Sequence, residues 1–69
     1  MIREGTKVKW SWGDGTAEGK VEKTYTSKTT RTIKGNEVTR NGKEDDKALY
    51  IKTEDSYALK LESEVERAD

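Results

Sequence analysis

Polar and apolar residues alternate with a period of two along short stretches of this chain. In the stretch TKVKWSW (residues 6–12), the valine and the two tryptophans fall on one side, and the lysines and the serine fall on the other. Such alternation is typical of an antiparallel strand with one buried face and one solvated face. Gly13-Asp14-Gly15 follows at once, and these residue types favour a turn. The pattern therefore predicts a half-buried strand that ends in a tight turn.

The same pattern predicts further strands over residues 16–26, within a hairpin at 29–42, and over 48–53 and 57–61. The hairpin carries two turn signals, Lys34-Gly35-Asn36 and Asn41-Gly42. Lys23 falls on the inward side of its strand, which predicts a β-bulge nearby. Gly19 in the same strand predicts the close approach of another side chain, and an indole of the first strand is the candidate.

Alternation also assigns apolar side chains to faces. Leu49 and Ile51 share one face of their strand and Tyr50 lies on the other, whereas Tyr57, Leu59 and Leu61 share a side of the next strand. The two tryptophans differ. Trp10 lies inward in mid-strand, and a buried indole stabilises a core by roughly 3–5 kcal/mol, judged by Trp-to-Ala losses. Trp12 lies beside the turn, where a barrel opens, so we expect its ring to be partly exposed.

Short strands, glycine-rich turns and the lack of a long helical pattern predict the all-β class. For a chain this small we expect a closed SH3-like or Tudor-like barrel of about five antiparallel strands, because closure removes unpaired edges. Residues 1–69 then form a single domain. Residues 43–47 predict a solvated acidic loop. Ser63, three residues before Glu66, has the spacing of a capping box and predicts a short C-terminal helical turn.

Composition narrows the function classes. The chain has no Cys and no His, which excludes disulfides, thiol chemistry and the usual zinc and haem ligands. We therefore expect no metal and no cofactor. The sequence offers no activated nucleophile and no acid–base pair in a pocket, so we expect no enzyme. It has no apolar run of the length of a membrane span or a signal peptide, and we expect a cytoplasmic monomer that binds no membrane.

Charge and apolar content bear on folding. Leu, Ile and Val total ten and Phe is absent, which is below the apolar content at which a disordered chain becomes a serious alternative. A net charge of zero and the alternating runs favour a folded domain instead. Residues 1–43 carry ten Lys/Arg against five Asp/Glu, a net of +5, and residues 44–69 carry four against nine, a net of −5. Antiparallel pairing would bring these halves together and neutralise the surface.

Three segments together resemble a known domain family. They are VKWSWGDGTAEGKV (residues 8–21), KGNEVTRNG (34–42) and KLESEVE (60–66), and TAEGKV followed by TRNG is the most specific part. The arrangement is similar to the small Tudor-type domain named after hypervirulence-associated proteins, from Gly5 to Glu66. The sequence departs from that pattern at Lys47, where proline is common, and at Ser56, where glycine is common. The resemblance implies an SH3-like barrel of about five strands without enzymatic activity, and it implies no defined ligand.

We interpret the chain as a binding module that recognises a protein or peptide through an aromatic-lined surface. The surface is expected near Trp12, Tyr50 and the loops around Asp14 and Asp45. Tudor-type binders hold a methylated ammonium in a cage of three or four aromatic rings, although alternation along the strands does not bring four rings together. The candidate residues are Trp12, Asp14, Tyr25, Tyr50 and Tyr57.

Binding of single-stranded DNA or RNA is the alternative. A small barrel binds single strands when stacking rings lie within a basic groove. The candidate residues for such a basic face are Lys7, Lys9, Lys20 and Arg31. Glu18, Glu22 and Glu37 are interleaved with them and dilute the positive charge. Binding by counterion release weakens steeply with salt, so salt dependence separates this alternative from an aromatic-anchored peptide contact.

Overall fold

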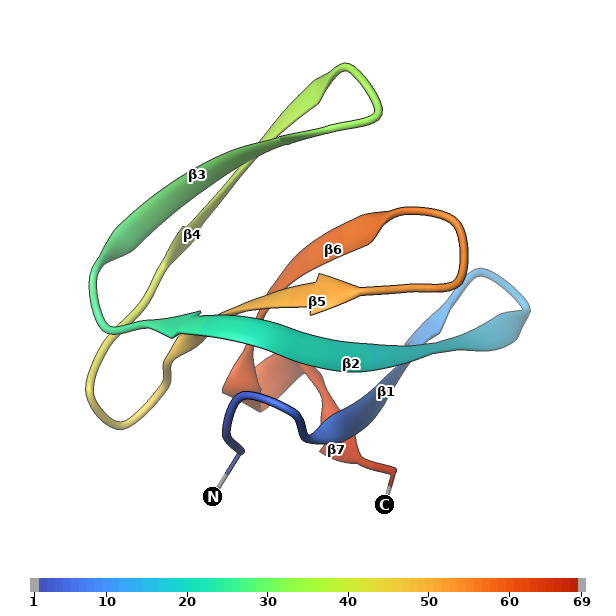
Figure 1. Ribbon diagram of the computed structural model, residues 1–69, viewed down its shortest axis with the longest axis horizontal. Helices are drawn as coiled ribbons and strands as arrows, with labels where there is room; N and C mark the ends of the chain where they lie inside the picture. Colours follow the sequence, from blue (N-terminus) through green and yellow to red (C-terminus); the bar gives the residue numbers. More distant parts are fainter. Residues whose placement is uncertain (1, 69) are drawn as a thin grey trace.

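The computed structural model describes residues 2–68, which form seven strands and one 3₁₀ turn (Figure 1). In chain order these elements are β1 (Lys7–Trp12), β2 (Gly15–Tyr25), β3 (Lys28–Ile33), β4 (Asn36–Asn41), β5 (Ala48–Lys52), β6 (Tyr57–Leu61), η1 (Glu62–Glu64) and β7 (Glu66–Arg67). The all-β class is confirmed, and β1 to β6 lie where alternation predicts strands. β7 has no counterpart among the predicted strands.

β2 joins the two halves of the main sheet. Within residues 2–68 this sheet has five antiparallel strands in the order β6-β5-β2-β1-β7. β2 pairs with β1 from Gly15 to Lys20 and with β5 from Lys20 to Tyr25. Its register with β5 shifts between Val21 and Lys23, so the predicted bulge is confirmed. A bulge bends a strand, and Figure 1 shows β1 crossing β2 at a steep angle while β5 runs alongside it.

The expected closed barrel is not formed by the described residues. β6 and β7 stand at opposite ends of the strand order, and across residues 2–68 they do not pair with each other. In the same range, β3 and β4 form a separate two-stranded sheet. The physical reason is that this hairpin satisfies its hydrogen bonds internally and lies over β6 instead of extending the main sheet.

The inner face of the main sheet carries the hydrophobic core. Val8, Val21, Leu49 and Ile51 are fully buried, and Trp10 is 8% exposed. Ile2 joins them from the segment before β1, and the half-buried residues Ala17, Ala58 and Val65 pack against this cluster. The predictions that Trp10 belongs to the core and that Leu49 and Ile51 share its face are confirmed.

The β3–β4 hairpin covers part of the outer face of β5 and β6, and it leaves Lys52 and Tyr57 exposed. Its side chains alternate: the residues of one face are exposed, and those of the other, except Asn36 at the turn, are buried or half-buried, namely Thr29, Arg31, Ile33, Val38 and Arg40. Leu59, which pairs with Tyr50 on the covered face, is 2% exposed although it lies outside the main core cluster. The molecule therefore has a second, smaller buried layer between the hairpin and β5–β6.

Gly19 allows β2 to lie close to β5. A Cβ atom on Gly19 would lie 2.5 Å from the carbonyl oxygen of Lys52 and 2.6 Å from Cγ2 of Ile51. Contacts this short are not tolerated by a real side chain, so glycine is required here. The predicted close approach is therefore confirmed, but the predicted indole partner is wrong, because the neighbour is β5.

The two turn signals of the hairpin segment have different outcomes. Lys34 and Gly35 form the turn between β3 and β4, with φ values of 50° and 79°. Asn41-Gly42 is not a hairpin turn, because it lies where the end of β4 passes the end of β2. A Cβ atom on Gly42 would lie 2.5 Å from the carbonyl oxygen of Tyr25, so this glycine is also required by close approach.

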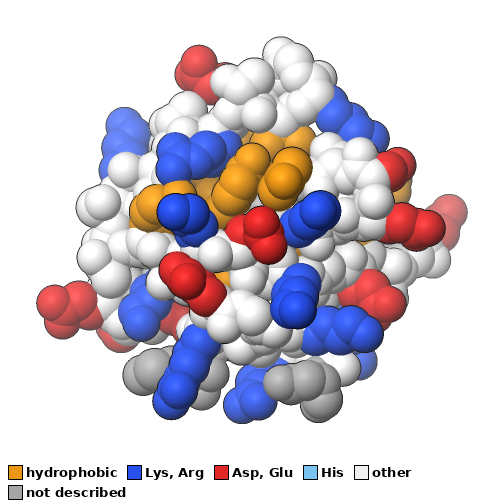
Figure 2. Space-filling view, in the orientation of Figure 1, with side chains coloured by type: hydrophobic (Ala, Val, Ile, Leu, Met, Phe, Trp, Pro, Cys, Tyr) orange, Lys and Arg blue, Asp and Glu red, His pale blue; other side chains and the backbone are white. Residues whose placement is uncertain are grey.

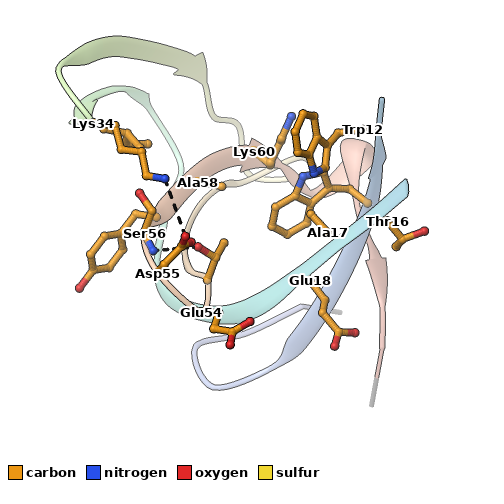
Figure 3. A pocket seen from close by; sticks show the side chains of 14 residues that line it. Trp12, Thr16, Ala17, Glu18, Lys34, Glu54, Asp55, Ser56, Ala58 and Lys60 are labelled. Atoms are coloured by element: carbon orange, nitrogen blue, oxygen red, sulfur yellow. Dashed lines mark hydrogen bonds and ion pairs between the residues drawn. The ribbon is translucent and has the colours of Figure 1, made fainter. Parts of the chain in front are cut away.

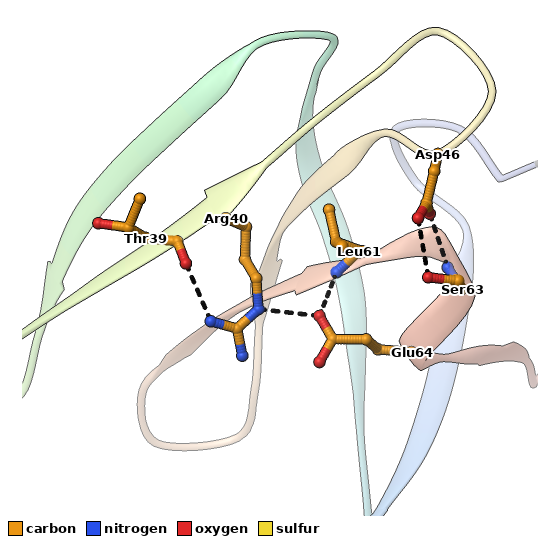
Figure 4. A network of polar contacts seen from close by, with 6 residues as sticks. All are labelled: Thr39, Arg40, Asp46, Leu61, Ser63 and Glu64. Atoms are coloured by element: carbon orange, nitrogen blue, oxygen red, sulfur yellow. Dashed lines mark hydrogen bonds and ion pairs between the residues drawn. The ribbon is translucent and has the colours of Figure 1, made fainter.

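The C-terminal turn forms at other residues than the predicted capping box. In η1, Oε1 of Glu64 accepts the backbone N–H of Leu61 at 2.9 Å, so the i, i+3 hydrogen bond starts two residues earlier than expected. Ser63 instead donates its backbone N–H and its hydroxyl to the Asp46 carboxylate, at 2.9 and 2.8 Å (Figure 4). The loop at residues 43–47, expected to be solvated, thus anchors the turn through Asp46.

Candidate functional site

A groove of about 590 Å³ opens beside Trp12, where the ends of three hairpins meet. Its floor is apolar and consists of Trp10 from β1, Ala17 from β2 and Ala58 from β6, which belong to the core or pack against it. The remaining lining residues form the walls and a largely polar rim: Trp12, Thr16, Glu18, Ile33, Lys34, Thr53, Glu54, Asp55, Ser56, Tyr57 and Lys60.

Trp12 lies at the end of β1 and forms one wall of the groove. It is 69% exposed, whereas Trp10 on the same strand is 8% exposed. Trp10 pairs with Ala17 inside the sheet, but Trp12 pairs with Gly15 next to the turn, where no side chain covers it. Figure 3 shows Trp12 and Lys60 on one side of the groove, with Lys34 and Asp55 on the other. The prediction of an exposed Trp12 is confirmed.

Charges of both signs surround the groove. Its acidic lining residues are Glu18, Glu54 and Asp55, and its basic ones are Lys34 and Lys60. Nζ of Lys34 lies 4.0 Å from Oδ2 of Asp55, which joins the tip of the β3–β4 hairpin to the β5–β6 loop (Figure 3). Both side chains are largely exposed, so this ion pair stabilises the groove only weakly.

Three tyrosines lie on the outer face of the main sheet. The rings of Tyr50 and Tyr57 stack with their centroids 4.7 Å apart and their planes 3° from parallel. The guanidinium carbon of Arg31, from β3, lies 4.9 Å from the ring centroid of Tyr25 and 5.7 Å from that of Tyr50. Nη2 of Arg31 also donates to the Tyr25 hydroxyl at 2.6 Å. A cation of this chain therefore already occupies the tyrosine surface.

The predicted peptide-binding residues fall into separate places. Trp12 and Tyr57 line the groove. Tyr25 and Tyr50 contact Arg31 beneath the hairpin, and Asp14 lies in the exposed β1–β2 turn. Among the described residues, the ring contacts join tyrosines to one another or to Arg31 and leave Trp12 apart. A cage of four converging rings is therefore not formed.

Three of the four residues predicted for nucleic-acid binding come together. Lys7, Lys9 and Lys20 are exposed on the outer face of β1 and β2, where Lys7 pairs directly with Lys20 and Lys9 lies opposite Glu18. Arg31 is separate from them because its guanidinium contacts the tyrosines. Figure 2 shows positive and negative side chains intermixed on the face it presents.

Arg40 and Glu64 tie the hairpin to the C-terminal turn (Figure 4). Nε of Arg40 donates to Oε1 of Glu64 at 2.8 Å, and the same oxygen accepts the Leu61 N–H. Partial burial raises the pKa of Glu64, but the hydrogen bonds from Leu61 and Arg40, together with the charges of Arg40 and Lys60, outweigh it. The pKa of Glu64 is therefore held below its usual value, and the carboxylate stays ionised.

The sequence did not identify several residues of the groove. Ala17 and Ala58 leave space beside Trp10 because their side chains are small, and Ile33 and Lys34 reach the groove from the tip of the hairpin. Alternation along the strand could have placed Ala17 at the groove, since it puts this residue on the same inward face as Val21. The approach of Ile33 and Lys34 depends on how the hairpin folds over β6, for which a local pattern carries no signal.

Within residues 2–68, no group of three or more carboxylate, imidazole or thiol side chains is arranged to hold a metal ion. No helix in the described part of the chain has the length and apolarity needed to cross a membrane.

The family model described as the TUDOR domain of hypervirulence associated proteins matches residues 5–65. The matched region runs from just before β1 to the end of η1 and contains every lining residue of the groove. No curated protein and no solved structure matches the chain.

Proposed function

The chain belongs to the family of hypervirulence-associated TUDOR domains, and we propose that it binds an extended segment of a partner protein in the groove beside Trp12. Tudor domains are generally binding modules and are typically non-catalytic. The observation that carries the proposal is the 69% exposure of Trp12 above an apolar floor.

A chain with so few apolar residues loses possible stabilisation when it leaves an indole exposed, because burial of that ring would enlarge a small core. Tryptophan is also among the residue types that dominate binding energy at interfaces, where it anchors the centre of the contact. In the groove, Trp12 stands beside Ala17 and Ala58, which are small enough to admit a side chain of a partner. We therefore assign to Trp12 the role of the anchor.

The shape of the groove favours a peptide segment over a compact small molecule. Its volume of about 590 Å³ falls within the range of ligand sites. It is open to solvent, however, and its rim is formed by the ends of three hairpins. A chain segment can cross such a groove, place one apolar side chain on the floor and form hydrogen bonds with the polar rim at Thr53, Ser56 and Lys60.

A peptide selection with an NMR readout tests the proposal. Short random peptides displayed on phage would be selected against the folded protein, and a selected peptide would be titrated into the ¹⁵N-labelled chain. We expect the largest shifts at the Trp12 indole N–H and at the amides of Ala17 and Ala58. Trp12→Ala should weaken binding by roughly thirtyfold, as expected for loss of an anchor worth about 2 kcal/mol.

Lys28→Ala provides the control, because Lys28 is exposed on β3 and does not line the groove. That variant should bind the selected peptide with unchanged affinity. Shifts confined to the outer face of β1 and β2, or a Trp12→Ala variant with full affinity, would contradict the proposal.

A further inference from the structure

We propose that the outer face of the main sheet binds a single strand of nucleic acid, through a line of three lysines that ends at a tyrosine. Lys7 pairs with Lys20 across β1 and β2, Lys20 pairs with Lys52 across β2 and β5, and Lys52 pairs with Tyr57 across β5 and β6. Directly paired residues of neighbouring strands share a face and lie about 5 Å apart. We call Lys7, Lys20 and Lys52 the lysine row.

The lysine row is an unfavourable arrangement in the free protein. Like charges directly opposite each other on neighbouring strands destabilise a sheet, and Lys20 has such a neighbour on each side. All three side chains are exposed, and among the described residues none of them forms an ion pair or a hydrogen bond through its side chain. A chain of phosphates lying along the row would replace this repulsion with attraction.

Tyr57 supplies a ring at the end of the row. It is 37% exposed, and one face of its ring stacks on Tyr50. The stack holds the Tyr57 ring in place, so a base that adds to it loses little additional freedom. Stacking on aromatic side chains is how proteins hold unpaired bases without reading their sequence. A duplex keeps its bases paired inside and gains nothing from this ring.

The tyrosine also distinguishes nucleic acid from an acidic peptide. Carboxylates would satisfy the lysine row equally well, but they leave the Tyr57 ring unused. Acidic side chains restrict the footprint, because Glu18 and Glu66 both lie opposite Lys9 and Glu22 lies at the bulge of β2. The row is thus a short track, suited to a few nucleotides of a single strand.

The test is fluorescence anisotropy of a labelled oligothymidylate of about twelve nucleotides, measured with the full chain between about 50 and 200 mM salt. We expect affinity to fall with salt and to fall further, by roughly tenfold, in the double variant K20Q/K52Q. Each lost phosphate contact lowers the slope of log affinity against log salt by about 0.7 for single strands, so this slope should drop by about 1.4. The matched control is K28Q/K43Q, which removes the same charge from exposed positions outside the row.

Further variants and ligands separate single-strand binding from the binding of a duplex, of an acidic peptide or of a segment in the groove. Tyr57→Leu should weaken oligothymidylate binding by about fivefold or more at high salt as well as low salt, because stacking is not screened. Trp12→Ala should leave it unchanged, which keeps this proposal distinguishable from the groove. Equal binding of a duplex or of polyglutamate would overturn it, and so would the absence of binding or an equal loss in K20Q/K52Q and K28Q/K43Q.

Thermal stability gives an independent readout that needs no ligand. At low salt, Lys20→Gln should raise the melting temperature, because it removes repulsion from Lys7 and Lys52 together. The gain should shrink as added salt screens the charges. A lower melting temperature for Lys20→Gln would show that the row is not strained by its own charge, and it would overturn this part of the inference.

Discussion

Trp10 and Trp12 are the same residue type on the same strand, and their pairing partners set them apart. Trp10 lies opposite Ala17 within the core, and Trp12 lies opposite Gly15 at the strand end. Trp10→Ala should remove about 3–5 kcal/mol of stability. Since a domain of this length has roughly 3–10 kcal/mol in total, we expect the variant to lose the dispersed amide resonances of a folded protein.

Trp12→Ala is the matched comparison at the same scale. With 69% of its surface exposed, the Trp12 side chain contributes little buried area, and we expect a change in stability of less than about 1 kcal/mol. Its melting curve should resemble that of the unmodified chain. If both variants unfold alike, the division between a structural and a surface tryptophan is wrong.

Arg31 illustrates what a residue pattern alone does not reveal. In the sequence it is one basic residue among several, and it fits a basic face. In the structure its guanidinium lies over Tyr25 and Tyr50 and donates to the Tyr25 hydroxyl. This contact depends on the hairpin folding back over β5, which is a tertiary arrangement. The same arginine therefore holds the hairpin against the sheet and is not available as a free cation for phosphate.

At the scale of elements, the junction of β2, β3 and β5 depends on Gly42. A Cβ atom there would lie 2.5 Å from the carbonyl oxygen of Tyr25 and 2.9 Å from the backbone nitrogen of Ala48. Tyr25 and Ala48 pair in the main sheet, so the backbone has no room to yield. Gly42→Ala should cost about 1–3 kcal/mol or more in urea unfolding.

Gly15→Ala is the control for this substitution. A Cβ atom on Gly15 meets nothing within 4 Å, and the residue does not have a positive φ. We expect its stability to remain within about 0.5 kcal/mol of the unmodified chain. Equal losses for the two variants would show that close approach at Gly42 is not the cause.

The contact between β4 and η1 predicts a pH dependence. Because the folded pKa of Glu64 lies below its usual value of 4.5, the ionised carboxylate stabilises the fold. This contribution is fully present well above pH 4.5 and is lost as the pH falls through the folded pKa. Glu64→Gln should lower the melting temperature by about 4 °C near pH 7, as expected for about 1 kcal/mol.

The difference in melting temperature between Glu64→Gln and the unmodified chain should narrow as the pH falls through the folded pKa of Glu64, which lies below 4.5, because both side chains are then neutral. Glu37→Gln serves as the control, because Glu37 is exposed on β4 away from the network. A difference in melting temperature that does not change with pH would mean that the hydrogen bonds of Glu64 stabilise the fold and that its charge does not.

The positions of the strands were easier to predict from the sequence than the pairing between them. β6 occupies residues 57–61 as expected, because Tyr57, Leu59 and Leu61 alternate with less apolar residues. β7 has two residues, Glu66 and Arg67, and carries no alternation to recognise. The lysine row requires the register on both sides of the β2 bulge, and a slip of one residue would move every side chain to the other face. Register is a long-range property, so the row follows from the structure and not from the local pattern.

At the scale of the whole molecule, the hairpin brings the two oppositely charged halves of the chain together. The hairpin forms an ion pair with each of two acidic residues, through Lys34 with Asp55 and Arg40 with Glu64. Each joins a basic residue of the hairpin to an acidic residue of the second half. Opposite charges of the two halves thus meet where the hairpin contacts the β5–β6 loop and η1, whereas the pairing of β2 with β5 places Lys20 opposite Lys52.

This arrangement predicts that the hairpin opens before the main sheet. Its own sheet has two strands, and it is held by a small buried layer and by partly exposed charges, whereas β2 and β5 border the core. Amide hydrogen exchange should therefore be faster in β3 and β4 than in β2 and β5. Salt at about 0.5 M screens the two ion pairs and should speed exchange in the hairpin while leaving β2 and β5 unchanged. Exchange at one common rate in all four strands, at low and high salt, would show instead that the hairpin and the sheet unfold as a single unit.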